Sequence, residues 1–156
     1  MKANGATLDD NQAEADTVGV SGGQLRRLML AGVPKPVSRA KAFTAQALAD
    51  WSEPGYAGEA AQDVLLLVAE LVANAVMHAG GPLELALRAS EGTLRVEVSD
   101  SSPVLPAARE PHLPGVPGGH GLFIVQRTAR RWGAEPHGRG KTVWAETAVP
   151  GAAAHG

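Results

Sequence analysis

The sequence contains no cysteine, which excludes disulfide bonds, a thiol nucleophile and a cysteine-ligated zinc or iron–sulfur site. Aromatic residues make up only 4% of the chain, so aliphatic side chains must build the core. No uninterrupted apolar run approaches the roughly 20 residues of a bilayer span, and residues 1–23 lack the apolar segment of a secretory signal. We therefore expect a cytoplasmic protein that makes no contact with a membrane.

An excess of basic charge is also missing. The formal net charge is −2, and residues 1–23 carry four acidic side chains against one lysine. The remainder of the chain is close to neutral, so it lacks the basic field that is typical of nucleic-acid-binding domains. We therefore expect no direct contact with nucleic acid.

The length and composition of the chain predict one folded domain. Its 156 residues, of which 44% are hydrophobic, suffice for one buried core. Residues 1–23 are polar and acidic and show no hydrophobic period, which predicts a disordered acidic tail. Residues 151–156 predict a short flexible tail, so the domain is expected over residues 24–150.

Hydrophobic periodicity predicts the elements of this domain. In chain order they are a strand over 24–30, helices over 39–51 and 59–79, a hairpin of strands over 83–88 and 94–99, a helix over 121–132 and a strand over 142–149. Residues 101–119 hold five prolines and three glycines, which predicts a long loop. Helices segregated from a mixed, mainly antiparallel sheet predict an α+β fold, a two-layer α/β sandwich with helices on one face of the sheet.

The helix expected over 59–79 is apolar on nearly every side, yet it carries a polar stripe. The stripe consists of Asp63, Glu70, Asn74 and His78. Successive members from Glu70 onward lie about 40° apart around the helix axis. Two interpretations fit this spacing. The stripe faces solvent, or it lines a cavity in which Asn74 supplies an oxygen to Mg²⁺ and Glu70 takes a proton from an attacking hydroxyl.

Two further segments have the residue types of a ligand site. The run Gly118-Gly119-His120-Gly121 precedes an expected helix, where glycines let backbone N–H groups approach a phosphate. The same run also fits a flexible hinge. Asp100 follows an alternating strand, where a carboxylate either begins a turn or faces a site.

Other nucleotide and catalytic motifs are excluded. Gly140-Lys141-Thr142 has the ending of a P-loop, but Glu135 stands where that motif needs glycine, and a strand follows instead of a helix. The dinucleotide glycine pattern fails at Ile124. The histidines lack zinc-site spacing, and the chain has no serine-nucleophile elbow.

The order of these features resembles the GHKL superfamily, whose ATP-binding Bergerat fold is shared by histidine kinases, DNA gyrase and the ninety-kilodalton heat-shock chaperones. The resemblance rests on Glu70-Leu-Val-Ala-Asn74-Ala-Val-Met-His78, Asp100, Gly118-Gly119-His120-Gly121-Leu122 and Gly140-Lys141-Thr142. It covers about residues 25–149. Within the superfamily the chain is most similar to the small anti-sigma-factor serine kinases and ATP-binding regulators of actinomycetes.

The resemblance implies a site for ATP and Mg²⁺ near the long helix. Asn74 would coordinate the Mg²⁺ that bridges the phosphates, and Glu70 would be the catalytic base that polarises a serine hydroxyl. Asp100 would accept the exocyclic amine of adenine, and Thr142 would place a hydroxyl beside it. His78 would complete the cofactor-binding part of the helix.

The resemblance also assigns a phosphate-binding loop. The backbone of Gly119, His120 and Gly121 would cradle the phosphates, flanked by Gly118 and Leu122, and residues 101–118 would form a lid over the nucleotide. One departure is plain, because the usual D-x-G-x-G is here Asp100-Ser101-Ser102-Pro103-Val104 and both glycines are missing.

Two functions remain open at this point. The first is an ATP-dependent serine/threonine protein kinase that sequesters a sigma factor and phosphorylates an anti-sigma antagonist of the STAS type. The second is a non-catalytic nucleotide-binding or partner-docking module with a degenerate ATP site. Glu70 favours the first function and the altered segment after Asp100 favours the second, while a homodimer is compatible with both. A sensor-kinase fragment is disfavoured, because residues 1–23 contain no phosphoacceptor helix.

Overall fold

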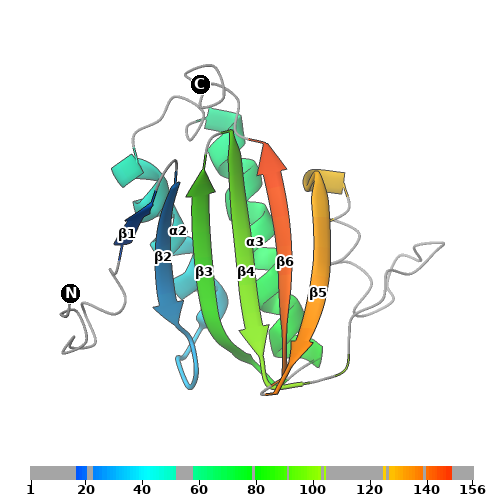
Figure 1. Cartoon of the computed structure of the whole chain (residues 1–156). Coiled ribbons are helices and arrows are strands. Elements are labelled where there is room, and N and C mark those ends of the chain that lie inside the picture. Colours follow the sequence, from blue (N-terminus) through cyan, green and yellow to red (C-terminus); the bar gives the residue numbers. More distant parts are fainter. Residues whose placement is uncertain are drawn as a thin grey trace.

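The computed structural model describes residues 17–20, 23–51, 58–78, 80–90, 92–102, 104, 125, 127–138 and 140–148. These residues form a six-stranded sheet with the strand order β1-β2-β3-β4-β6-β5, and each neighbouring pair is antiparallel. The strands are β1 (Thr17–Val20), β2 (Gly23–Met29), β3 (Pro82–Ser90), β4 (Thr93–Asp100), β5 (Arg131–His137) and β6 (Gly140–Ala148). Helices α2 (Pro36–Trp51) and α3 (Gly58–His78) lie together on one face of the sheet (Figure 1). The expected α+β sandwich is confirmed, although the described pairings are antiparallel throughout rather than mixed.

Alternation along the central strands separates an inner from an outer face of the sheet. In β4, Leu94, Val96 and Val98 are buried, while the residues between them are only half-buried. The same period of two continues through β6, where Val143 and Ala145 are buried. Such alternation is typical of an antiparallel sheet with one packed face and one wet face.

The inner face of the sheet packs against the two helices. Helix α2 contributes Ala40, Phe43, Thr44, Ala47, Leu48 and Trp51 to the buried set. Helix α3 contributes Val64, Leu67, Val68, Leu71, Val72 and Ala75. Together with the inner side chains of β2, β3, β4 and β6, the apolar residues of these two sets form one hydrophobic core. Burial of each large aliphatic side chain contributes about 2 kcal/mol, so this core is the main stabilising element.

Helix α3, over Gly58–Met77, is the one helix in the described part of the chain that is long and apolar enough to cross a membrane by length and composition. Its place in the fold accounts for this composition. Leu67, Val68 and Val72 are fully buried in the core, and Glu59 and Asp63 are exposed at its N-terminal end. The helix is therefore the core helix of the sandwich.

The first departure from expectation is at the β2 edge of the sheet. Residues 17–20 form β1, which pairs with β2 from Thr17 opposite Arg26 to Val20 opposite Gly23. The disordered tail expected over 1–23 is therefore wrong for these four residues and for Gly23, while residues 1–16, 21 and 22 lie outside the described part. The physical reason is that the edge of β2 offers unpaired backbone groups, which a short Thr-Val-Gly-Val segment satisfies.

The second departure is at the opposite edge. The helix expected to continue to Trp132 is wrong beyond Thr128, because residues 131–137 form β5 and pair with β6. Pairing covers the edge that β6 would otherwise expose, and Trp132 and Ala134 pack against the core. Pro136 is accommodated because β5 is an edge strand, where a missing N–H breaks no interior ladder.

Candidate functional site

A tight turn after α3 leads into β3, and the start of β3 lies beside the end of β4. The Gly81 N–H donates to the carbonyl of Ala75, 2.9 Å away, which folds the chain back directly after the helix. The next residue, Pro82, begins β3 and lies opposite Asp100 in the β3–β4 register. Asp100 in turn lies opposite Lys141 at the start of β6. The last turns of α3 and the ends of these three strands therefore meet at one end of the sandwich, the lower end in Figure 1.

The carboxylate of Asp100 is buried at this end and is held by two donors. The residue is only 2% exposed. Its Oδ1 accepts a hydrogen bond from the Ser102 N–H at 2.9 Å and from the Lys141 ammonium at 3.0 Å. A buried carboxylate is costly unless it is paired in this way. The expectation that Asp100 begins a turn is confirmed, and the same side chain also faces the inner layer.

Gly140 brings the backbones of two strand ends unusually close together. A Cβ at this position would lie 2.1 Å from the Asp100 carbonyl oxygen and 2.7 Å from the Ser101 carbonyl carbon. The φ angle of Gly140 is +151°, which L side chains rarely adopt. Only glycine therefore fits beside Asp100, and this explains the glycine of the Gly140-Lys141-Thr142 motif without a P-loop.

The residues of the polar stripe expected on helix α3 differ in their exposure to solvent. Asp63 is exposed, whereas Glu70 and Asn74 are half-buried at the border of the core. Within the described part of the chain, the side chains of Glu70 and Asn74 have no hydrogen bond or ion pair. Asn74 directly precedes Ala75, whose carbonyl is bound by the turn that leads to β3. Both groups are therefore available to a ligand, with Asn74 in the last turns of α3. The side chain of His78 lies outside the described residues.

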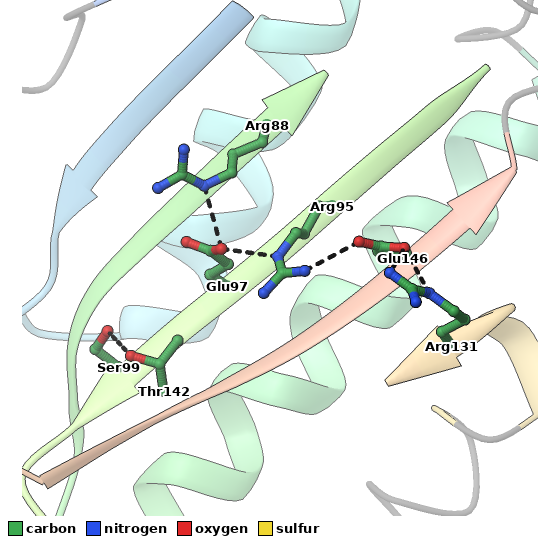
Figure 2. Close-up of polar contacts among 7 residues, drawn as sticks. All are labelled: Arg88, Arg95, Glu97, Ser99, Arg131, Thr142 and Glu146. Carbon is green, nitrogen blue, oxygen red and sulfur yellow. Dashed lines mark hydrogen bonds and ion pairs between the residues drawn. The ribbon is translucent and has the colours of Figure 1, made fainter. Parts of the chain in front are cut away.

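The structure places Thr142 on the other face of the sheet from the Asp100 side chain. Its partner across the β4–β6 pair is Ser99, and the two hydroxyl oxygens are 2.9 Å apart (Figure 2). Successive residues of a strand point to opposite faces, so Thr142 belongs to the outer face. The prediction that the Thr142 hydroxyl lies beside Asp100 is therefore wrong.

Lys141 is the residue that sequence reasoning missed. It is 6% exposed and its ammonium binds Asp100. The alternation of β6 could have identified Lys141 from the sequence. Val143 and Ala145 are apolar, and a period of two places Lys141 on the same inner face. A lysine at an inward position is unusual enough to have indicated an ionic partner.

The proposed phosphate loop lies outside the described residues. This applies to Gly118, Gly119, His120, Gly121 and Leu122, so their predicted role is not tested by the structure. Among the residues that are described, no three or more His, Asp or Glu side chains gather into a metal site.

The fold and this strand-end site define a class of protein, a two-layer sandwich with a buried acidic acceptor and a half-buried Glu–Asn pair at one end. A comparison with family profiles gives the same class, because residues 34–147 match the histidine kinase-like ATPase domain. The chain belongs to this family, and membership implies that the domain binds ATP. A search of curated proteins finds no relative that matches.

Proposed function

We propose that this protein is an ATP-binding regulator that acts as a serine/threonine protein kinase on an anti-sigma antagonist of the STAS type and also binds a sigma factor. The observation that carries the proposal is the buried Asp100 carboxylate at the end of the sandwich where α3 presents Asn74. A buried acceptor for an adenine amine and a neutral oxygen ligand for Mg²⁺ are two parts of an ATP site. The proposed compartment is the cytoplasm, and the proposed function involves no direct binding to nucleic acid or to membrane lipid.

Each of the side chains has a distinct role in the proposed site. Asp100 accepts the exocyclic amine of adenine, and Asn74 donates its amide oxygen to Mg²⁺. Glu70 lies one helical turn before Asn74, so both project from neighbouring positions of α3. The glycine run at 118–121 supplies backbone N–H groups to the phosphates.

The chemistry asked of these residues is modest, because phosphoryl transfer depends mainly on positioning and charge neutralisation. The substrate hydroxyl oxygen forms a bond to the γ-phosphorus, and the bond from that phosphorus to the β–γ bridging oxygen breaks. ADP leaves, and the hydroxyl proton passes to the Glu70 carboxylate. ATP supplies the phosphoryl group when it is bound, and the chain supplies the base and the orientation.

Calorimetric titration with Mg²⁺–ATP tests the nucleotide site. The wild-type protein should bind, and Asn74→Ala and Asp100→Ala should each weaken binding at least about tenfold, which is about 1.4 kcal/mol. Asp63→Ala is the matched control, because Asp63 is an exposed acid on the same helix. Wild-type protein that gives no binding heat, or variants that bind as tightly as wild type, would exclude this site.

The kinase activity needs a separate experiment. Purified protein, radiolabelled ATP and a STAS-type antagonist encoded beside it in the genome should give a phosphorylated antagonist. Glu70→Gln should lower the transfer rate by about 10²–10⁴-fold, the usual contribution of a general base, while nucleotide affinity stays within about threefold. Transfer that continues at the wild-type rate in Glu70→Gln would remove Glu70 from the mechanism.

A non-catalytic module is the second candidate, and the turn after Asp100 favours it. Ser102 stands where the family pattern has a glycine, and its N–H is bonded to Asp100. The Val104 N–H binds the Ser102 hydroxyl at 3.2 Å, so this segment forms local turns of its own. Under this alternative the protein binds ATP and docks its partner, as a monomer or a homodimer, and no phosphate reaches the antagonist.

A further inference from the structure

Lys141 is a buried lysine whose charge lies inside the candidate site. Its side chain is 7% exposed, and lysine is almost never buried to this extent without a partner. The ammonium donates to Oδ1 of Asp100 at 3.0 Å and to the Ser102 carbonyl oxygen at 3.2 Å. Because β4 and β6 place Asp100 directly opposite Lys141, the contact is set by the register of the sheet.

The geometry leaves one carboxylate oxygen of Asp100 for a ligand. The bonds from Lys141 and from the Ser102 N–H both end on Oδ1. A carboxylate has two oxygens, each able to accept hydrogen bonds. Within the described residues Oδ2 is therefore the acceptor that remains, and its orientation is determined by the two donors on Oδ1.

The hydrogen-bonding chemistry of the Asp100 carboxylate bears on which base the site prefers. An ionised carboxylate only accepts, so it attracts the amine of adenine and repels the carbonyl of a 6-oxopurine. Because Lys141 holds Oδ1 of Asp100, its loss would change the orientation of Oδ2 and with it the preference of the site between the two bases.

We propose that Lys141 is a positioning residue for base selection: its ammonium holds Oδ1 of Asp100, so that Oδ2 is oriented to accept the exocyclic amine of the base. The assignment rests on the proposed ATP site and adds a specificity residue to it. Lys141 acts through Asp100 and does not take part in phosphoryl transfer.

Calorimetric titration with Mg²⁺–ATP and with Mg²⁺–inosine triphosphate, which has a carbonyl in place of the amine, tests the proposal. Wild type should prefer ATP. Lys141→Met should weaken ATP binding about tenfold or more and inosine triphosphate binding less than about threefold, so the preference falls. Lys41→Met, an exposed lysine on α2, is the control and should leave both affinities unchanged.

A second pair of variants covers the case in which Lys141→Met does not fold, because that variant leaves a buried carboxylate unpaired. Asp100→Asn and Asp100→Asn/Lys141→Met are compared for the same two nucleotides, with circular dichroism to verify folding. If Lys141 acts only by holding the Asp100 carboxylate, both variants should show the same preference within about twofold.

The outcomes separate the two claims. Equal losses of ATP and inosine triphosphate in Lys141→Met would mean a merely structural lysine and would overturn the assignment alone. A further tenfold fall of the preference on adding Lys141→Met to Asp100→Asn would also overturn it. If wild type binds neither nucleotide, the proposed function fails, and the role of Lys141 fails with it.

Discussion

At the scale of single residues, Gly140 determines how closely β6 approaches the end of β4. The position it occupies has no room for a Cβ, since the nearest atom would be the Asp100 carbonyl oxygen. Directly after it, Lys141 turns inward to Asp100. Gly140 therefore permits the close approach of the two strand ends, and this approach brings the Lys141 ammonium to Asp100.

Gly140→Ala should be destabilising by about 3 kcal/mol or more, because the new methyl group meets backbone atoms and the φ angle is unfavourable. Urea unfolding followed by circular dichroism measures the change. Gly138→Ala is the matched control: nothing lies within 4 Å of its added Cβ, and we expect a change below about 0.5 kcal/mol. Equal stability of the two variants would contradict the close approach.

At the scale of elements, α3 combines a buried face with a half-buried polar border. Leu67 and Val68 are fully buried against the sheet, while neighbouring Leu66 is 42% exposed. Glu70 and Asn74 lie at the border between these faces. The helix therefore anchors the core with one side and presents the candidate site with another, so packing and ligand binding share one rigid element.

Leu67→Ala should lower the free energy of unfolding by about 2–5 kcal/mol, because it removes a fully buried side chain and leaves a cavity. Leu66→Ala changes the same residue type one position earlier on the exposed side, and we expect a loss below about 1 kcal/mol. Urea titration of both variants measures the difference. Similar losses would show that α3 packs with a different face.

At the scale of the whole molecule, the outer face of the sheet is linked by a chain of ion pairs that crosses four strands. Arg88 binds Glu97, Glu97 binds Arg95, and Arg95 and Arg131 both bind Glu146 (Figure 2). Trp144 lies within cation–π distance of two arginines, 4.1 Å from Arg95 and 5.5 Å from Arg131. The network covers the wet face with alternating charge and joins β5 to the centre of the sheet.

Glu146 makes this network sensitive to acid. Burial raises the pKa of its carboxyl, but hydrogen bonds from Arg131 and Arg95 outweigh that effect, and the pKa lies below its ordinary value of 4.5. A carboxyl with a lowered pKa in the folded state stabilises the fold above its unfolded pKa. This contribution is lost as the pH falls through the lowered folded value.

Glu146→Gln should therefore cost about 1 kcal/mol at pH 7, the scale of a networked surface pair, and the cost should shrink as the pH falls below the ordinary carboxyl value of 4.5. Urea unfolding between pH 7 and pH 3 measures this. Glu135→Gln, an exposed glutamate on β5, is the control and should show no such pH-dependent difference. A cost for Glu146→Gln that persists unchanged at pH 3 would contradict the lowered pKa of Glu146 in the folded state.

Local patterns in the sequence account for most of the central fold. The helices expected over 39–51 and 59–79 are observed within three residues at their ends, and the hairpin is observed as β3 and β4. These predictions succeeded because hydrophobic period and glycine or proline boundaries are local properties. The edge strands β1 and β5 were not predicted, because such short segments become strands only when an unpaired neighbour is present.

Some features of the candidate site were also predictable from the sequence, and others were not. The Glu70–Asn74 spacing and the position of Asp100 were predicted from the sequence, and the structure finds Asp100 buried and the pair half-buried. The choice between Lys141 and Thr142 depends on which residue lies opposite Asp100. That choice required the β4–β6 register, which joins positions 41 residues apart.

The sequence by itself determined the class of fold and the long core helix, because each depends on composition and on short-range period, while the resemblance of its motifs to the GHKL superfamily indicated the candidate ATP-site residues. Only the tertiary structure decided that Lys141 faces Asp100, that Thr142 faces outward and that both edges of the sheet are covered by short strands. The physical reason is that strand pairing and register are set by contacts between distant segments, where a shift of one residue reverses the face on which every side chain lies.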